Sequence, residues 1–91
     1  MVNEGRHIPN RLRKHRRING YKQSEVVYIL GLKSSNRLSR WEQGLSMPSV
    51  ENLIKLSILY HVLIEELYFD LRLEFITEIN KKKKQHSDQK M

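Results

Sequence analysis

Hydrophobic residues recur along the chain every three or four positions, while strict alternation of apolar and polar residues is scarce. This periodicity is typical of amphipathic helices, so the pattern predicts an all-α protein. We expect the first helix to place Ile8, Leu12 and His15 on its core side. The expected helices are, in chain order, about Pro9–Arg17, Gln23–Leu30, Ser34 or Ser35 to Gln43, one that opens at Pro48–Ser49, and one from near Ile64 to Ile79 or into the lysines.

Turn and capping residues mark the boundaries between these helices. Asn19 and Gly20 end the first helix, and Gly31 and Gly44 follow the second and third, where a left-handed C-cap is expected. A serine at 34 or 35 can cap the third helix, and Ser49 is the expected N-cap of the fourth. The five helices therefore follow one another through short connections.

The last two helices carry more apolar residues than one buried stripe requires. The fourth should be largely buried through Val50, Leu53, Ile54, Leu56, Ile58 and Leu59. The fifth has two apolar stripes, and the surplus predicts contact with a second copy of the chain; the alternative is that this helix folds back and buries both. The residues expected at the dimer contact are Leu71, Phe75, Ile76 and Ile79.

Length and composition exclude several classes of protein. A chain of 91 residues is too short for two independent cores, and the absence of cysteine excludes disulfide scaffolds, thiolate zinc sites and cysteine nucleophiles. No apolar run is long enough for a membrane span, and residues 1–10 lack the apolar region of a secretory signal. We therefore expect a cytoplasmic protein with no membrane partner.

The net charge of +7 is unevenly distributed. Residues 1–47 hold ten Lys and Arg against three acidic residues, whereas residues 48–79 hold two against six. Residues 80–91 hold five lysines and one aspartate, which predicts a basic, flexible tail over 81–91. A strongly basic half favours nucleic acid as the partner.

Two short helices joined by a glycine-containing turn, the second rich in Ser, Asn and Arg, describe a helix-turn-helix. Further landmarks follow in order and at matching spacing. They are Leu12–Arg16, Tyr21–Val27, Gly31–Leu32, Leu38–Gly44, Pro48–Leu53 and Ile64–Tyr68. In these segments the chain resembles the Cro/CI-type repressor family, also called the XRE family.

The resemblance implies a five-helix repressor-like domain over residues 1–68, with an extension of the fifth helix over 69–80. It also implies a sequence-specific, double-stranded DNA-binding transcriptional regulator, a repressor, whose third helix (about 35–43) enters the major groove. Matched residue by residue, the base-contacting side chains are Ser35, Asn36, Arg37 and Arg40. The phosphate-contacting residues are Gln23, Lys22, Lys33, Ser34, Gln43, Gly44 and Ser46.

The resemblance also implies a structural ion pair between Arg16 and Glu42, and a homodimer on a palindromic operator. Capping remains an alternative role for Ser35 and Asn36, as a solvated surface does for Arg37 and Arg40. An enzyme is not expected, because the four histidines are scattered and no phosphate-binding glycine loop occurs, so we expect no cofactor and no metal. The alternative function is an antitoxin that binds a toxin protein and autoregulates its operon.

Overall fold

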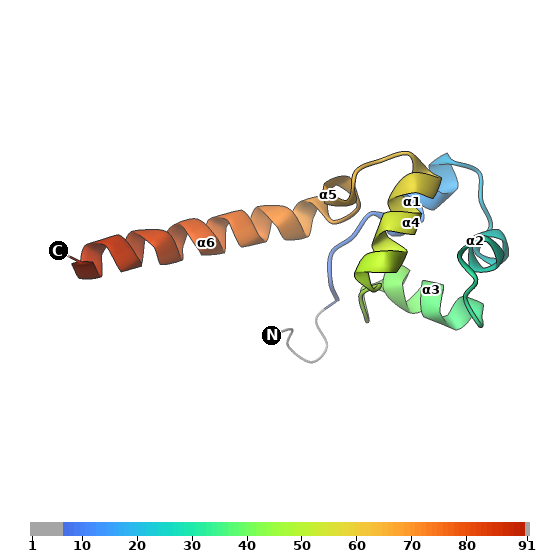
Figure 1. The fold of residues 1–91 in the computed structure, drawn as a ribbon, viewed down its shortest axis with the longest axis horizontal. Helices are drawn as coiled ribbons and strands as arrows, with labels where there is room; N and C mark the ends of the chain where they lie inside the picture. The colour runs from blue at the N-terminus through green and yellow to red at the C-terminus, as the bar shows by residue number, and fades with distance from the viewer. Residues whose placement is uncertain (1–6, 91) are drawn as a thin grey trace.

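The computed structural model describes residues 7–90, which form six α-helices and no strand. The helices are α1 (Leu12–Ile18), α2 (Gln23–Leu30), α3 (Ser35–Gln43), α4 (Val50–Tyr60), α5 (Ile64–Leu67) and α6 (Phe69–Lys90). The first five form a small bundle, and α6 projects from it as one long rod (Figure 1). The predicted all-α class is confirmed.

Local signals set the bounds of the middle helices. α2 has the predicted bounds and ends at Gly31, which takes the left-handed conformation with φ 72°. The hydroxyl of Ser49 accepts the N–H of Asn52, which confirms the predicted N-cap of α4. Ser34 precedes α3 in the N-cap position, although its side chain makes no capping hydrogen bond. His61 ends α4 with φ 56°, a conformation that favours glycine.

The core lies where α1 to α5 meet and is built from apolar residues with tyrosine and tryptophan. Leu12, Val26, Leu38, Leu56 and Leu67 are fully buried. Since every one of the first five helices contributes at least one buried side chain, none of them can shift without disturbing this cluster. The complete buried apolar set is Leu12, Val26, Leu30, Leu38, Trp41, Leu56, Tyr60, Leu67 and Tyr68.

The first helix begins at Leu12, three residues later than the sequence predicts. Ile8 donates its N–H to the carbonyl of Gly44 at 2.8 Å, which holds the preceding segment against the end of α3. The side chain of Asn10 then accepts the N–H of Leu12 at 3.0 Å. This local side-chain bond takes the place of an earlier helical turn, so Pro9 remains outside the helix.

The fourth helix is not largely buried, contrary to prediction. Leu56 and Tyr60 face the core, but Val50, Ile54 and Ile58 are 71%, 47% and 69% exposed. These three lie four residues apart and so form a stripe on the outer side of α4. The bundle is too small to cover both sides of α4, which explains why the wide apolar pattern was misleading.

The expected fifth helix is divided in two. Tyr68 leaves the helical conformation with φ −123° between α5 and α6, and both Leu67 and Tyr68 are buried. Two consecutive residues of a straight helix point in different directions, so this break allows both to enter the core. The segment 81–90, expected as a flexible tail, continues α6 as helix, and residues 72–89 are all exposed.

Candidate nucleic-acid interface

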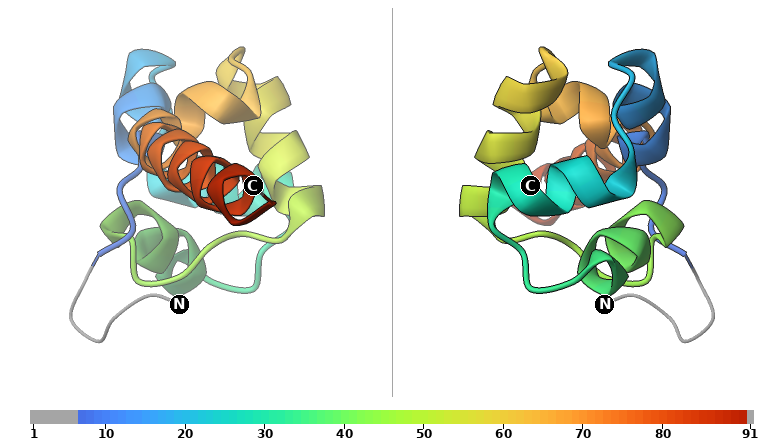
Figure 2. Two further views of the ribbon diagram at one scale, coloured as in Figure 1. Left: turned by 90° about the vertical axis from the view of Figure 1, so that its left-hand side faces the viewer. Right: turned by 90° about the vertical axis from the view of Figure 1, so that its right-hand side faces the viewer.

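Helices α2 and α3 form a helix-turn-helix, joined by the four residues 31–34. α3 lies along the lower edge of the bundle in both views of Figure 2, at the end remote from the tip of α6 (Figure 1). Leu38, Trp41 and Glu42 are the buried residues of α3. They fix its inner side against the bundle, so its opposite side faces solvent.

The four predicted base-contacting residues all lie on the surface of α3. Ser35, Asn36, Arg37 and Arg40 are exposed. Within residues 7–90 neither Arg37 nor Arg40 makes an ion pair, so both guanidinium groups are available to an external acceptor. Since Leu38 points into the core, Asn36 and Arg40 lie on the most outward side of the helix.

Ser39 belongs to the same outward stripe, although sequence reasoning did not select it. Asn36, Ser39, Arg40 and Gln43 are spaced as neighbours on one helical side. The Nε2 of Gln43 donates to the hydroxyl of Ser39 at 2.9 Å, which joins the two side chains. Counting the helical spacing forward from Asn36 would have found Ser39 in the sequence.

Glu42 connects the first three helices. Its side chain has no exposed surface and accepts hydrogen bonds from Arg16 at 2.6 and 3.1 Å, so the expected pair is present. Gln23 of α2 donates to the same carboxylate at 3.0 Å, and Arg13 lies 3.5 Å away. Arg16 also donates to the carbonyl of Tyr21 at 3.0 Å.

The contacts with Glu42 favour the charged form of Arg16. The bonds to Glu42 raise the pKa of Arg16 above its usual value, and they outweigh the opposing effect of burial. The guanidinium of Arg16 therefore remains ionised at neutral pH. A buried pair of this kind orients the elements it joins more than it adds net stability, and here it sets the direction of α3.

Fewer side chains at the start of α2 are available to contact phosphate than its sequence indicates. The amide nitrogen of Gln23, expected on a phosphate, instead donates to Glu42, which leaves the N-terminal backbone N–H groups of α2 as donors. Lys22 is exposed beside them, and its backbone N–H donates to the carboxylate of Glu25 at 2.8 Å. That bond compensates for the lysine's inability to cap the helix with its own side chain.

The loop after α3 is held in place by the backbone of Gly44. This glycine is buried, has φ 78°, and bonds through its N–H to Trp41 and through its carbonyl to Ile8. A Cβ at this position would collide with the backbone of Ile8. Because both its polar groups are engaged within the protein, Gly44 shapes the loop and does not itself present a donor to phosphate, contrary to expectation.

The remaining predicted phosphate contacts flank α3. Lys33 and Ser34 are exposed at its start, and Gln43 and the half-buried Ser46 lie at its end. They therefore border the outward stripe at both ends. Next to Ser46, the apolar side chains of Leu45 and Met47 are also exposed.

A second ion cluster joins α1 to α5 and to the base of α6. Glu66 lies 2.9 Å from His15 and 3.0 Å from Arg11, and these contacts lower the pKa of Glu66, the hydrogen bond from the histidine most strongly. Arg11 also lies over the ring of Phe69, 4.6 Å from its centre. The cluster fixes the angle at which α6 leaves the bundle.

Within residues 7–90 no group of three or more His, Cys, Asp or Glu side chains is placed to hold a metal ion. In the same part of the chain, no helix is long and apolar enough to cross a membrane.

The comparison with protein families gives one decisive match: the helix-turn-helix family model covers residues 12–67. The chain belongs to the helix-turn-helix family of the Cro/CI type. The comparisons with curated proteins and with solved structures give no match.

Family membership identifies the chain as a DNA-binding transcriptional regulator of a non-enzymatic family. The helix-turn-helix match runs from the first residue of α1 to the last residue of α5. It therefore covers the bundle, α3 included, while α6 lies outside it.

Proposed function

We propose that this regulator reads double-stranded DNA sequence-specifically, with α3 in the major groove. The observation that carries the proposal is the outward side of α3, where Asn36 and Arg40 are exposed and Arg40 is free of ion pairs within the described residues. Arginine pairs with the O6 and N7 of guanine, and asparagine with the N6 and N7 of adenine. Ser35, Arg37 and Ser39 complete the proposed reading surface.

We propose phosphate contacts on both sides of α3, in keeping with the same docking. We assign them to Lys22 and the first N–H groups of α2, to Lys33 and Ser34, and to Gln43 and Ser46. These contacts position the helix without reading sequence, and they make binding weaken as salt is added. The rigid attachment of α3 through Glu42 supports the proposal, because a reading helix has to be held in one orientation.

We propose a homodimer on a palindromic operator, which the exposed apolar side of α6 supports. Phe75, Ile76 and Ile79 are 49%, 38% and 54% exposed, and Leu71 is half-buried beside them. A two-fold dimer of this kind reads two half-sites about one helical turn apart. We also propose that binding to the operator represses transcription, as the resemblance to Cro/CI-type repressors implies.

The experiment is a mobility-shift series with Arg40→Ala on the preferred duplex and on single-base variants of it. We expect about 10-fold to 100-fold weaker binding on the preferred duplex and relaxed selectivity at one base position. Lys33→Ala should weaken binding to all duplexes alike and reduce its salt dependence. Lys55→Ala removes the same charge on α4 and is the matched control. It should change neither the affinity for DNA nor the salt dependence of binding.

Equal affinity of the wild type for all duplexes would refute sequence-specific reading. Loss of affinity in Arg40→Ala that is the same for every duplex would reassign that arginine to phosphate. Random-duplex selection with the wild type then reports the operator, and a palindrome with half-sites about one turn apart is expected.

A second candidate function rests on a different surface. The stripe of Val50, Ile54 and Ile58 on α4 ends at a hollow where Ile58 lies beside Ile29 of α2, which is 52% exposed. An apolar surface of this kind fits a protein partner, as an antitoxin that binds a toxin requires. Ile58→Glu should then abolish binding to a toxin encoded beside this gene and leave DNA binding intact; unchanged toxin binding would exclude this surface.

A further inference from the structure

The charges along α6 are divided between its two halves. Asp70, Glu74 and Glu78 outnumber Arg72 in the first half, and four consecutive lysines, Lys81–Lys84, outnumber Asp88 in the second. A helix that is acidic and then basic is complementary to a copy of itself running in the opposite direction. A parallel copy would instead place lysine against lysine.

An apolar groove of about 410 Å³ runs along the base of α6. α6 contributes Leu71, Phe75 and Ile79, and the bundle contributes Met47 and Leu53. The groove thus lies in the angle between the projecting helix and the body. A second helix lying there would cover both the exposed side of α6 and the bundle residues beside it.

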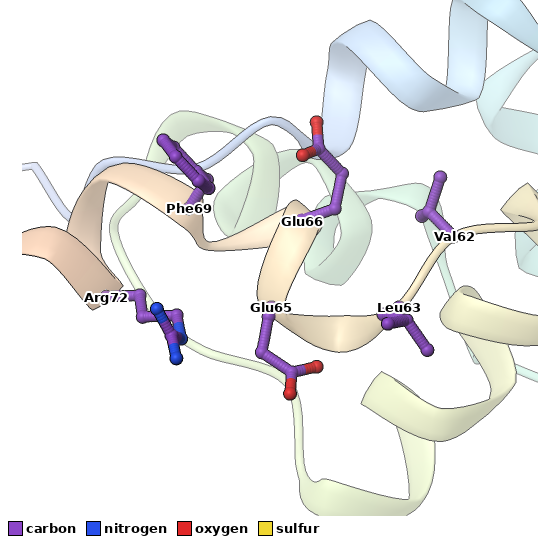
Figure 3. A pocket seen from close by; sticks show the side chains of 6 residues that line it. All are labelled: Val62, Leu63, Glu65, Glu66, Phe69 and Arg72. Atoms are coloured by element: carbon purple, nitrogen blue, oxygen red, sulfur yellow. The ribbon is translucent and has the colours of Figure 1, made fainter.

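Glu65 lies at the edge of this groove and of a neighbouring cleft. The neighbouring cleft is lined by α5 and the first turns of α6, with the carboxylates of Glu65 and Glu66 and the ring of Phe69 at its walls (Figure 3). Glu66 is engaged by α1, whereas Glu65 is exposed and makes no ion pair within residues 7–90. Glu65 is therefore an available anion beside an apolar groove.

We propose that α6 of one copy lies antiparallel in the groove of the other, with Lys82 and Lys83 of each copy against Glu65 of its partner. The apolar stripe extends from Leu71 to Ile79, so a two-fold pair buries it best when centred on Phe75. In that register the lysines of one helix lie beside the junction of α5 and α6 in the other copy.

Helical spacing selects two of the four lysines. Lys82 and Lys83 lie seven residues after Phe75 and Ile76, and so continue the apolar stripe toward the partner. Lys81 and Lys84 lie on the other side of α6. In this pairing Lys82 and Lys83 contact the partner copy, and no phosphate contact is assigned to them.

The inference rests on the proposed homodimer and adds its direction, its register and its charged contacts. The test compares Lys82→Glu/Lys83→Glu with Lys81→Glu/Lys84→Glu, two variants of identical composition and net charge. The dimer dissociation constant is measured at low salt by sedimentation equilibrium, and circular dichroism checks that both variants keep their helix content. We expect about tenfold weaker dimers for the first variant and less than threefold for the second.

Adding Glu65→Lys to Lys82→Glu/Lys83→Glu reverses both partners of each contact and should restore the wild-type dimer constant. α6 projects away from its own bundle, so such a rescue has to occur between copies (Figure 1). Wild-type dimers should also weaken with added salt, because the contacts are attractive. A dimer that both double variants weaken equally, or that Glu65→Lys does not rescue, would overturn the pairing.

Disulfide trapping tests the direction independently, because the chain has no cysteine of its own. In the proposed register Ile79 lies opposite Leu71 of the partner, so a mixture of Ile79→Cys and Leu71→Cys chains should form a mixed disulfide on oxidation. Rapid disulfide formation by Ile79→Cys alone would indicate parallel helices and overturn the proposal. A wild-type chain that is monomeric at micromolar concentration would remove the homodimer as well, while the Arg40→Ala series still tests DNA reading.

Discussion

Removing the carboxylate of Glu42 is expected to destabilise the protein more than removing its partner Arg16. Glu42→Leu leaves the guanidinium of Arg16 in the bundle at 8% exposure with only the carbonyl of Tyr21 as acceptor. Arg16→Leu, in contrast, leaves the carboxylate with the amide of Gln23 at 3.0 Å and Arg13 at 3.5 Å. Removing one partner of this ion pair should therefore lower the free energy of unfolding more than removing the other.

The magnitudes follow from what each change leaves buried. An arginine stranded by Glu42→Leu corresponds to about 3–5 kcal/mol of lost stability. For Arg16→Leu, where hydrogen bonds to the carboxylate remain, we expect about 1–3 kcal/mol. The double variant replaces a buried charged pair by two apolar side chains, so its loss should be at least about 2 kcal/mol smaller than the sum of the single losses.

Urea denaturation followed by the fluorescence of Trp41 measures these differences. Trp41 is the single tryptophan, is 3% exposed, and precedes Glu42 on α3, so its emission reports the unfolding of this region. The matched control is the exposed pair of Lys55 and Glu51 on α4, 3.5 Å apart, whose coupling should be below about 0.5 kcal/mol. Additive losses for Arg16→Leu and Glu42→Leu, within about 0.5 kcal/mol, would refute the reasoning.

Three further predictions concern other parts of the bundle. Gly44→Ala forces a side chain into a left-handed residue against neighbouring backbone, and should lower the unfolding free energy by about 2 kcal/mol or more while weakening DNA binding; unchanged stability would show that the loop can move away. The hydroxyl of Tyr60 is buried without a hydrogen-bond partner in the described chain, so Tyr60→Phe should be neutral or stabilising by about 1 kcal/mol in the same urea assay, and a clear loss would indicate a partner. His15 and Arg11 hold the pKa of Glu66 below its usual value, so this cluster stabilises the fold fully above that usual value, near 4.5, and less as the pH falls through the folded pKa. Melting temperatures of Glu66→Gln should therefore depend less on pH in the acid range than those of the wild type.

Short-range signals in the sequence predicted the middle of the fold well. The bounds of α2 and the N-cap at Ser49 were correct because each depends on residues at most four positions away. The start of α1 was wrong because a distant contact decides it: the backbone of Ile8 bonds to Gly44, thirty-six residues further along the chain. No local pattern reports that bond.

Burial was harder to predict than helix position. Periodicity showed that α4 has a wide apolar surface, but not which part of it the bundle covers, and Val50, Ile54 and Ile58 remain outside. The break at Tyr68 was also missed, since both sides of it are strongly helical in sequence. In both cases, which side chains become buried depends on how the short helices pack together, and the sequence pattern of a single helix does not report that packing.

In the candidate site, too, features set by neighbouring residues were predictable and features set by distant contacts were not. The position and exposure of Asn36 and Arg40 could be inferred from the motif, because the inward residues of α3 determine its outward ones. The engagement of Gln23 with Glu42 could not, because it requires knowing that a buried carboxylate lies within reach of α2. Residue types and spacing thus located the proposed reading helix, while the distribution of hydrogen bonds decided which side chains remain free.

Two properties of the proposed DNA-binding dimer depend on separate parts of the chain. The residues proposed to select bases lie on α3, whose direction depends on the Glu42 contacts inside the matched domain. In the proposed dimer, the distance between two such helices depends on α6, which lies outside that domain and is attached through the cluster around Glu66. Changes in α6 should therefore alter the preferred spacing of half-sites and the affinity for paired sites, and leave the sequence of each half-site unchanged.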